Sequence, residues 1–112
     1  MINADRLTVK SAEALNEAVA LARRAGNPQV YDLHLLLALL AQDEGIVVPI
    51  LQKLGVNVTD FRRRAEAEAA RYPKQSDAQP TASRELNQVL DRSEKAAKEL
   101  GADAALVVVP YY

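Results

Sequence analysis

A nearly unbroken run of leucines constrains the fold of this chain more than any other feature. Residues 33–40 contain six leucines and a single polar side chain, that of His34. In a helix these leucines point in almost every direction, so the helix needs apolar neighbours on all sides. Asp32 can cap such a helix at its N-terminus. We therefore expect a central, buried helix over residues 33–42, with the rest of the chain packed around it.

Two longer amphipathic helices are predicted, one before and one after this central helix. The first spans Val9–Ala25, with Thr8 as its N-cap and Gly26 as its stop. The second spans residues 84–100, with Ser83 as its N-cap and a glycine as its stop. A shift of 75 residues places Thr8 on Ser83 and also aligns the two stops and much of the apolar stripes. This agreement indicates an internal duplication.

Shorter helices and a linker are predicted between the two long helices. Apolar residues over 46–54 predict a short helix, and a helix with a charged outer face is predicted over 60–72, beginning at Asn57 or Thr59. Residues 74–82 have the composition of a linker. With few aromatic residues and many alanines and leucines, the sequence predicts an all-α bundle of about five helices.

The composition excludes most catalytic and metal chemistry. The chain has no cysteine and only one histidine, so it can form neither a thiolate metal site nor a multi-histidine site. It also lacks the Gly-x-x-x-x-Gly-Lys-Ser/Thr loop that binds nucleotide phosphates. We therefore assign no catalytic residue, no metal ligand and no cofactor.

Charge and hydropathy limit the partners and the location of the chain. The net charge is −1, and Arg62–Arg64 are followed within a turn by Glu66 and Glu68, which predicts a solvated helix face and no nucleic-acid binding. No apolar run approaches the roughly 18 residues that cross a bilayer, and the N-terminus lacks the pattern of a secretory signal. We expect a cytoplasmic protein that does not bind membranes.

Several segments, in order along the chain, together resemble a known family. Residues 6–15 (RLTVKSAEAL), followed by residues 34–40 (HLLLALL), resemble the Clp N-terminal domain. Four shorter segments narrow the resemblance to ClpB-type AAA+ chaperones: residues 43–47 (DEGIV), 54–56 (LGV), 71–73 (RYP) and 83–87 (SRELN). The resemblance covers residues 3–101 and implies a pseudo-twofold helical bundle with no enzymatic activity of its own.

The resemblance also implies a division of the chain. Repeat 1 spans residues 4–73, the linker residues 74–82 and a partial repeat 2 residues 83–101, because the second His-Leu-Leu helix of the family does not follow. Residues 102–112 form an apolar tail with a row of β-branched residues. This tail resembles the strand ending in Pro-Tyr-Tyr of dihydrodipicolinate synthase-type lyases, but we assign no lyase activity to Tyr112.

The function implied by the resemblance is substrate recognition for a ClpB-type protein disaggregase. Such a domain binds exposed apolar segments of unfolded or aggregated proteins and delivers them to the AAA+ rings, which carry the ATPase activity. Its partners are then these clients and the rings of the parent chaperone. Two alternatives stay open: a truncated or chimeric assembly module that self-associates through its tail, and an adaptor-docking domain with a folded partner.

The candidate client-binding residues lie at the start of the first long helix and along the inner stripe of the last one. An N-cap role is the plain interpretation of the threonine, and core packing is the default role of the stripe. The resemblance implies client handling by the threonine and an apolar groove bordered by the stripe. The candidates are Thr8, Leu86, Val89, Leu90 and Ala96.

Two further expectations concern packing. We expect His34 to be structural, with its ring hydrogen-bonded to backbone groups of a neighbouring repeat. Because the second repeat is truncated, we expect the helix over residues 84–100 to leave its apolar stripe in water, at a cost of about 1.5–3 kcal/mol for each large side chain. A second copy of the chain or the tail would then cover the stripe, giving a homo-oligomer in the first case.

Overall fold

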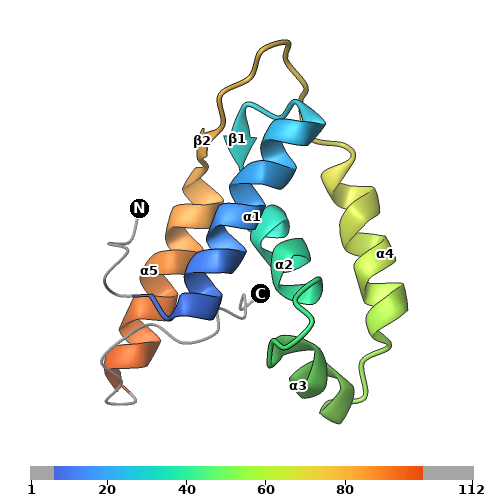
Figure 1. Ribbon diagram of the computed structural model, residues 1–112, viewed down its shortest axis with the longest axis vertical. Helices are drawn as coiled ribbons and strands as arrows, with labels where there is room; N and C mark the ends of the chain where they lie inside the picture. The colour runs from blue at the N-terminus through green and yellow to red at the C-terminus, as the bar shows by residue number, and fades with distance from the viewer. Residues whose placement is uncertain (1–6, 100–112) are drawn as a thin grey trace.

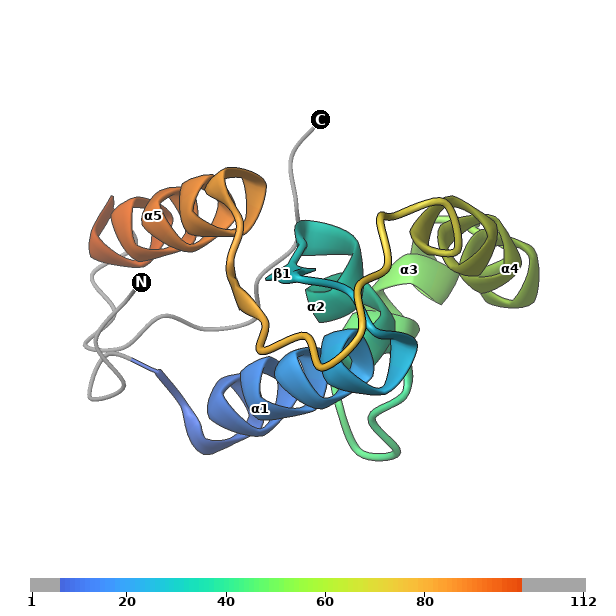
Figure 2. The same cartoon turned by 90° about the horizontal axis from the view of Figure 1, so that it is seen from above.

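The structure, a computed structural model, describes residues 7–99. In that part of the chain α2 lies at the centre, with α1 and α5 on one side of it and α3 and α4 on the other (Figure 1, Figure 2). The all-α prediction is confirmed. The predicted tail over residues 102–112 lies outside the described residues. In chain order the elements are α1 (Val9–Ala25), β1 (Gln29–Val30), α2 (Asp32–Leu40), α3 (Val47–Lys53), α4 (Val58–Ala69), β2 (Thr81–Ala82) and α5 (Arg84–Glu99).

The leucine-rich helix α2 forms the centre of the core, as its sequence predicts. Leu35, Leu39 and Leu40 are each only 2% exposed. Helices α1, α3, α4 and α5 all contact α2, so its apolar side chains meet apolar neighbours around most of the helix. The helix ends at Leu40, two residues before the predicted end.

Side-chain caps fix the starts of both long helices. The Thr8 Oγ1 accepts a hydrogen bond from the Ser11 backbone N–H at 3.1 Å, and the Ser83 Oγ accepts one from the Leu86 N–H at 3.0 Å. At the other end of α1, Gly26 has a φ of 73°, a left-handed conformation that favours glycine. The predicted bounds of α1 and the predicted start of α5 are therefore confirmed.

Removing the Thr8 cap gives a first test of this description. We expect Thr8→Ala to lower the free energy of unfolding by about 1 kcal/mol, because it leaves the Ser11 N–H without its acceptor. Urea denaturation followed by circular dichroism measures this change. Thr8→Ser keeps the hydroxyl and should stay close to the original chain, so equal loss in both variants would contradict the capping role.

A short parallel strand pair joins the segment after α1 to the segment before α5 and was not predicted. Gln29 lies opposite Thr81 and Val30 opposite Ala82, and the Ser83 N–H donates to the Val30 carbonyl at 3.0 Å. The last two residues of the predicted linker are therefore strand β2. This pairing sets where α5 begins relative to the end of α1.

The caps of α2 and α4 differ in part from the prediction. Tyr31, and not Asp32, is the N-cap of α2, because the ring of His34 three residues on accepts the Tyr31 N–H at 2.9 Å. Asn57 caps α4 by accepting from the Asp60 N–H at 3.1 Å. Of the two predicted starts for α4, the structure thus selects Asn57, and the helix ends at Ala69.

The expectation that α5 leaves its apolar stripe in water is wrong. Leu86 is 0% exposed and Leu90 is 1% exposed. Both belong to the same apolar cluster as Leu35 and Leu39, because α5 packs against α2. The central helix thus contributes to the cover that we expected to be missing.

The three consecutive arginines of α4 do not pair with Glu66 and Glu68 as their spacing suggests. Arg62 is half-buried and donates to the Leu40 carbonyl at 2.6 Å, which satisfies a free carbonyl at the C-terminus of α2. Arg63 and Arg64 form ion pairs with Asp60, one turn earlier. Only two of the three arginines therefore lie on the solvated face.

None of the helices within residues 7–99 combines the length and the hydropathy that a membrane-spanning helix requires.

Candidate protein-binding surfaces

The predicted client-binding residues belong to two antiparallel helices, α1 with its N-cap and α5. Thr8 precedes α1, and the other four candidates belong to α5. The start of α1 and the end of α5 lie at the same end of the molecule (Figure 1). Thr8 therefore lies toward the end of α5 that carries Ala96.

Burial divides the four α5 candidates into two groups. Leu86 and Leu90 are buried in the core, and Val89, at 9% exposed, lies at its edge. Ala96 is half-buried and lines a surface hollow of about 340 Å³ together with Arg92, Lys95 and Glu99. Ala96 and the edge of Val89 are accessible from the surface, whereas Leu86 and Leu90 could be reached only if α5 moved.

The Thr8 hydroxyl already has a donor and an acceptor. It accepts from the Ser11 N–H and donates to the Ser11 Oγ at 2.9 Å. Thr8 itself is half-buried. Its capping role is thus explicit in the geometry, while its exposed part leaves room for contact with a bound segment.

His34 holds three segments of the fold together. Its Nδ1 accepts the Tyr31 N–H, and its Nε2 lies 2.9 Å from the Asn27 Oδ1. Because the Asn27 amide nitrogen donates to the Pro73 carbonyl at 2.9 Å, the Asn27 oxygen is the acceptor and Nε2 carries the proton. Tyr31 also stacks on Tyr72 with ring centroids 3.8 Å apart.

This network corrects one expectation and supports another. The partners of His34, Tyr31 and Asn27, lie within residues 4–73, the stretch predicted as repeat 1, but the role of His34 is structural as expected. The ring is 3% exposed, and burial lowers the pKa of His34 below its ordinary value of 6.5, with Asp32 opposing that shift. His34 is therefore neutral at pH 7, with both ring nitrogens engaged.

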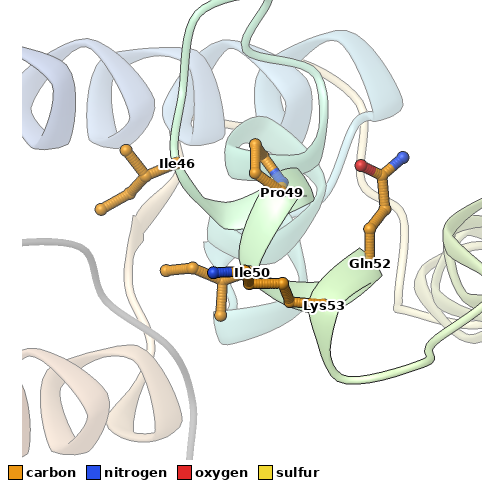
Figure 3. Close-up of a pocket in the computed structure, with 5 residues that line it drawn as sticks. All are labelled: Ile46, Pro49, Ile50, Gln52 and Lys53. Atoms are coloured by element: carbon orange, nitrogen blue, oxygen red, sulfur yellow. The ribbon is translucent and has the colours of Figure 1, made fainter.

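An apolar surface on α3 was not predicted from the sequence. Ile46, Pro49 and Ile50 line a hollow of about 570 Å³ together with Gln52 and Lys53. Ile46 is 53% exposed and Ile50 is 40% exposed, and the two side chains extend to the same side of the helix (Figure 3). The signal was present in the sequence, because residues 46–54 are apolar on more than one face.

Comparison with known proteins decides the family. The sequence matches the Clp repeat (R) N-terminal domain over residues 6–106. The chain belongs to this family. The resemblance seen in residues 6–15 and 34–40 is thereby confirmed. Clp N-terminal domains are non-catalytic, and the ATPase activity of the proteins that carry them lies in other domains.

Individual relatives agree with this assignment. The chain is 42% identical over 97 residues to the chaperone protein ClpB of Corynebacterium diphtheriae, which covers 84% of this chain and 11% of that protein. The N-terminal domain of the ClpV1 ATPase from the E. coli EAEC Sci1 T6SS has a TM-score of 0.83 at 22% identity, covering 89% of this chain and 61% of that one. A ClpV N-domain in complex with a VipB peptide has a TM-score of 0.76 at 24% identity, with the same coverage. The match thus covers only a small part, 11%, of the length of that ClpB protein.

Proposed function

We propose that this Clp N-terminal domain recognises exposed apolar segments of unfolded or aggregated proteins for a ClpB-type AAA+ chaperone. The observation that carries the proposal is the 42% identity to a ClpB over 84% of the chain. The AAA+ rings of such a chaperone would receive the captured segment. The proposal further assigns the domain to residues 1–101, with repeat 1 over residues 4–73 and a partial repeat 2 over residues 83–101.

The proposed binding region follows the accessible side of α5. Ala96 and the edge of Val89 provide apolar surface, and Thr8 lies at the same end of the molecule as the end of α5. Burial of client side chains there contributes about 25 cal/mol per Å² of apolar area. Ordering a flexible client opposes this gain, so we expect weak binding by one domain and stronger binding when several domains act together in a ring.

Substitution at Ala96 tests this region without disturbing the core. We expect Ala96→Asp to weaken binding of unfolded casein by at least about fivefold, because a client would then have to bury a carboxylate. Fluorescence anisotropy of labelled casein measures the affinity. Gln88→Asp introduces the same charge at an exposed position of α5 and should change the affinity little. Equal weakening in both variants would indicate a general charge effect and contradict the proposed site.

A second candidate function is docking of a partner peptide or adaptor. It is favoured by the VipB peptide bound to a structurally similar ClpV N-domain. The two functions differ in competition experiments. An excess of unfolded casein should displace a labelled client from the α5 region, whereas an adaptor held at a separate site would stay bound.

A further inference from the structure

Helix α3 is apolar on two opposite faces, of which the fold uses only one. Val47 is 2% exposed, and Val48 and Leu51 pack partly buried against the core. These three residues form the inner face that contacts α2 and α4. A short helix needs only one such face to be held in a small domain.

The outer face of α3 carries a second apolar stripe with helical spacing. Ile46, Pro49, Ile50 and Leu54 follow one another at intervals of three, one and four residues, which places them on neighbouring turns of one side. Ile46, Ile50 and Leu54 are 53%, 40% and 72% exposed, and they are three of the four large apolar side chains most open to solvent within residues 7–99. We call Ile46, Pro49, Ile50, Lys53 and Leu54 the α3 face.

The concentration of exposed side chains on one short helix points to a partner. Isolated apolar side chains on a surface need no explanation, whereas a contiguous exposed apolar patch marks an interaction site. The α3 face also borders the open hollow of about 570 Å³, so its apolar side chains are accessible to a partner from the surface (Figure 3). Helix α3 lies on the other side of α2 from α5 (Figure 2). The α3 face shares no residue with the proposed client region.

Charges of opposite sign flank the α3 face in the sequence. Asp43 and Glu44 precede Ile46 in the loop before α3, and Lys53 ends the helix. All three side chains are exposed, and within residues 7–99 none of them forms an ion pair. A partner that is acidic beside Lys53 and basic beside the two acids would complement both ends.

We propose that the α3 face docks an amphipathic helix of a partner protein, antiparallel to α3, with acidic residues near its N-terminus and basic residues near its C-terminus. The apolar stripe of that helix packs on Ile46, Ile50 and Leu54, side chain against side chain as in other helix–helix contacts. Its N-terminal acid lies beside Lys53, and its C-terminal base lies beside Asp43 and Glu44. This charge order also matches the helix dipole of the partner, which favours acids at the N-terminus and bases at the C-terminus.

Two synthetic peptides of about 14 residues, or four helical turns, test the proposal. Both peptides carry leucines at positions i, i+3, i+4 and i+7. The forward peptide has glutamates in its first turn and lysines in its last turn. The reversed peptide has lysines in its first turn and glutamates in its last turn. We expect the forward peptide to bind about fivefold more tightly, as two solvent-exposed charge pairs allow. Two-dimensional NMR of the full chain measures both affinities and should show shifts centred on Ile46, Ile50 and Leu54.

Charge reversal on the protein provides the control. Lys53→Glu should remove or invert the preference for the forward peptide, whereas Lys74→Glu, an equally exposed lysine in the loop after α4, should leave it unchanged. Ala96→Asp should not affect peptide binding, which keeps this inference separate from the proposed client function. Equal affinities for the two peptides, or no binding of either, would overturn the inference. Peptide-induced shifts centred on α5 would also overturn it. So would shifts of the α3 face that grow with protein concentration in the absence of peptide, because they would identify a second copy of the chain as the occupant.

Discussion

Replacing Leu90 by alanine is expected to lower the free energy of unfolding by about 2–5 kcal/mol, the usual cost of removing a buried leucine side chain. Leu90 is 1% exposed and belongs to the same apolar cluster as the leucines of α2. A domain of this size has a total stability of about 5–15 kcal/mol, so a large part of it depends on this contact. The substitution should therefore shift the urea midpoint strongly or unfold the chain.

Two matched variants make the Leu90 experiment decisive. Leu54→Ala removes the same atoms from a side chain that is 72% exposed and should change stability by less than about 0.5 kcal/mol. Leu90→Met preserves volume and should cost less than about 1.5 kcal/mol, which provides a folded variant if Leu90→Ala does not fold. Equal and small effects of Leu90→Ala and Leu54→Ala would show that α5 is not held in the core.

Mild acid is expected to destabilise the domain through His34. Burial lowers the pKa of His34 in the folded chain, whereas the unfolded chain keeps a value near 6.5. As the pH falls through about 6.5 the unfolded state binds the proton first, so the free energy of unfolding falls, by up to about 1.4 kcal/mol per pH unit. Well above pH 6.5 the ring is neutral in both states, and its contribution to stability is fully present.

The structural reason for this acid sensitivity is the occupied Nδ1 of His34. A proton there would face the Tyr31 N–H that Nδ1 now accepts and would break the cap of α2. Urea denaturation at several pH values measures the slope, and His34→Gln, which does not titrate, serves as the reference. We expect a clearly smaller slope in His34→Gln as the pH falls below about 6.5. Identical slopes would mean that other groups cause the acid sensitivity.

The parts of the fold that depend on local signals could be predicted from the sequence. Thr8 and Gly26 set both ends of α1, because capping needs only residues within a turn of each end. The leucine run likewise identified the central helix. The predicted N-cap of α2, Asp32, is one residue away from the actual N-cap, Tyr31. Aspartate is a far more common N-cap residue than tyrosine. The hydrogen bond from the Tyr31 N–H to the His34 ring is visible only in the structure.

Features that depend on distant contacts could not be predicted. The pairing of Val30 with Ala82 joins two-residue strands far apart in the chain, and neither strand has a periodic pattern of its own. The burial of Leu86 and Leu90 likewise depends on contacts with residues far away in the chain, among them the leucines of α2, which the pattern of α5 alone does not indicate. The same reason explains Arg62, whose spacing from nearby acids suggested ion pairs and whose actual acceptor is the Leu40 carbonyl.

The candidate site was predicted less completely than the fold. Sequence reasoning treated the α5 stripe as one surface, whereas burial separates accessible Ala96 from the enclosed Leu86 and Leu90. The stripe pattern cannot make this distinction, because the same spacing is typical of core and of groove. The outer face of α3 went unnoticed since its apolar residues fit a buried helix equally well.

The most direct test of client recognition is a two-dimensional NMR titration of the full chain with unfolded casein. We expect chemical-shift changes that saturate and are localised to Thr8, Val89 and Ala96. The resonances of Ile46 and Ile50 on the α3 face should not change. A spectrum that does not change with added casein, or shifts confined to α3, would contradict recognition of apolar clients along α5.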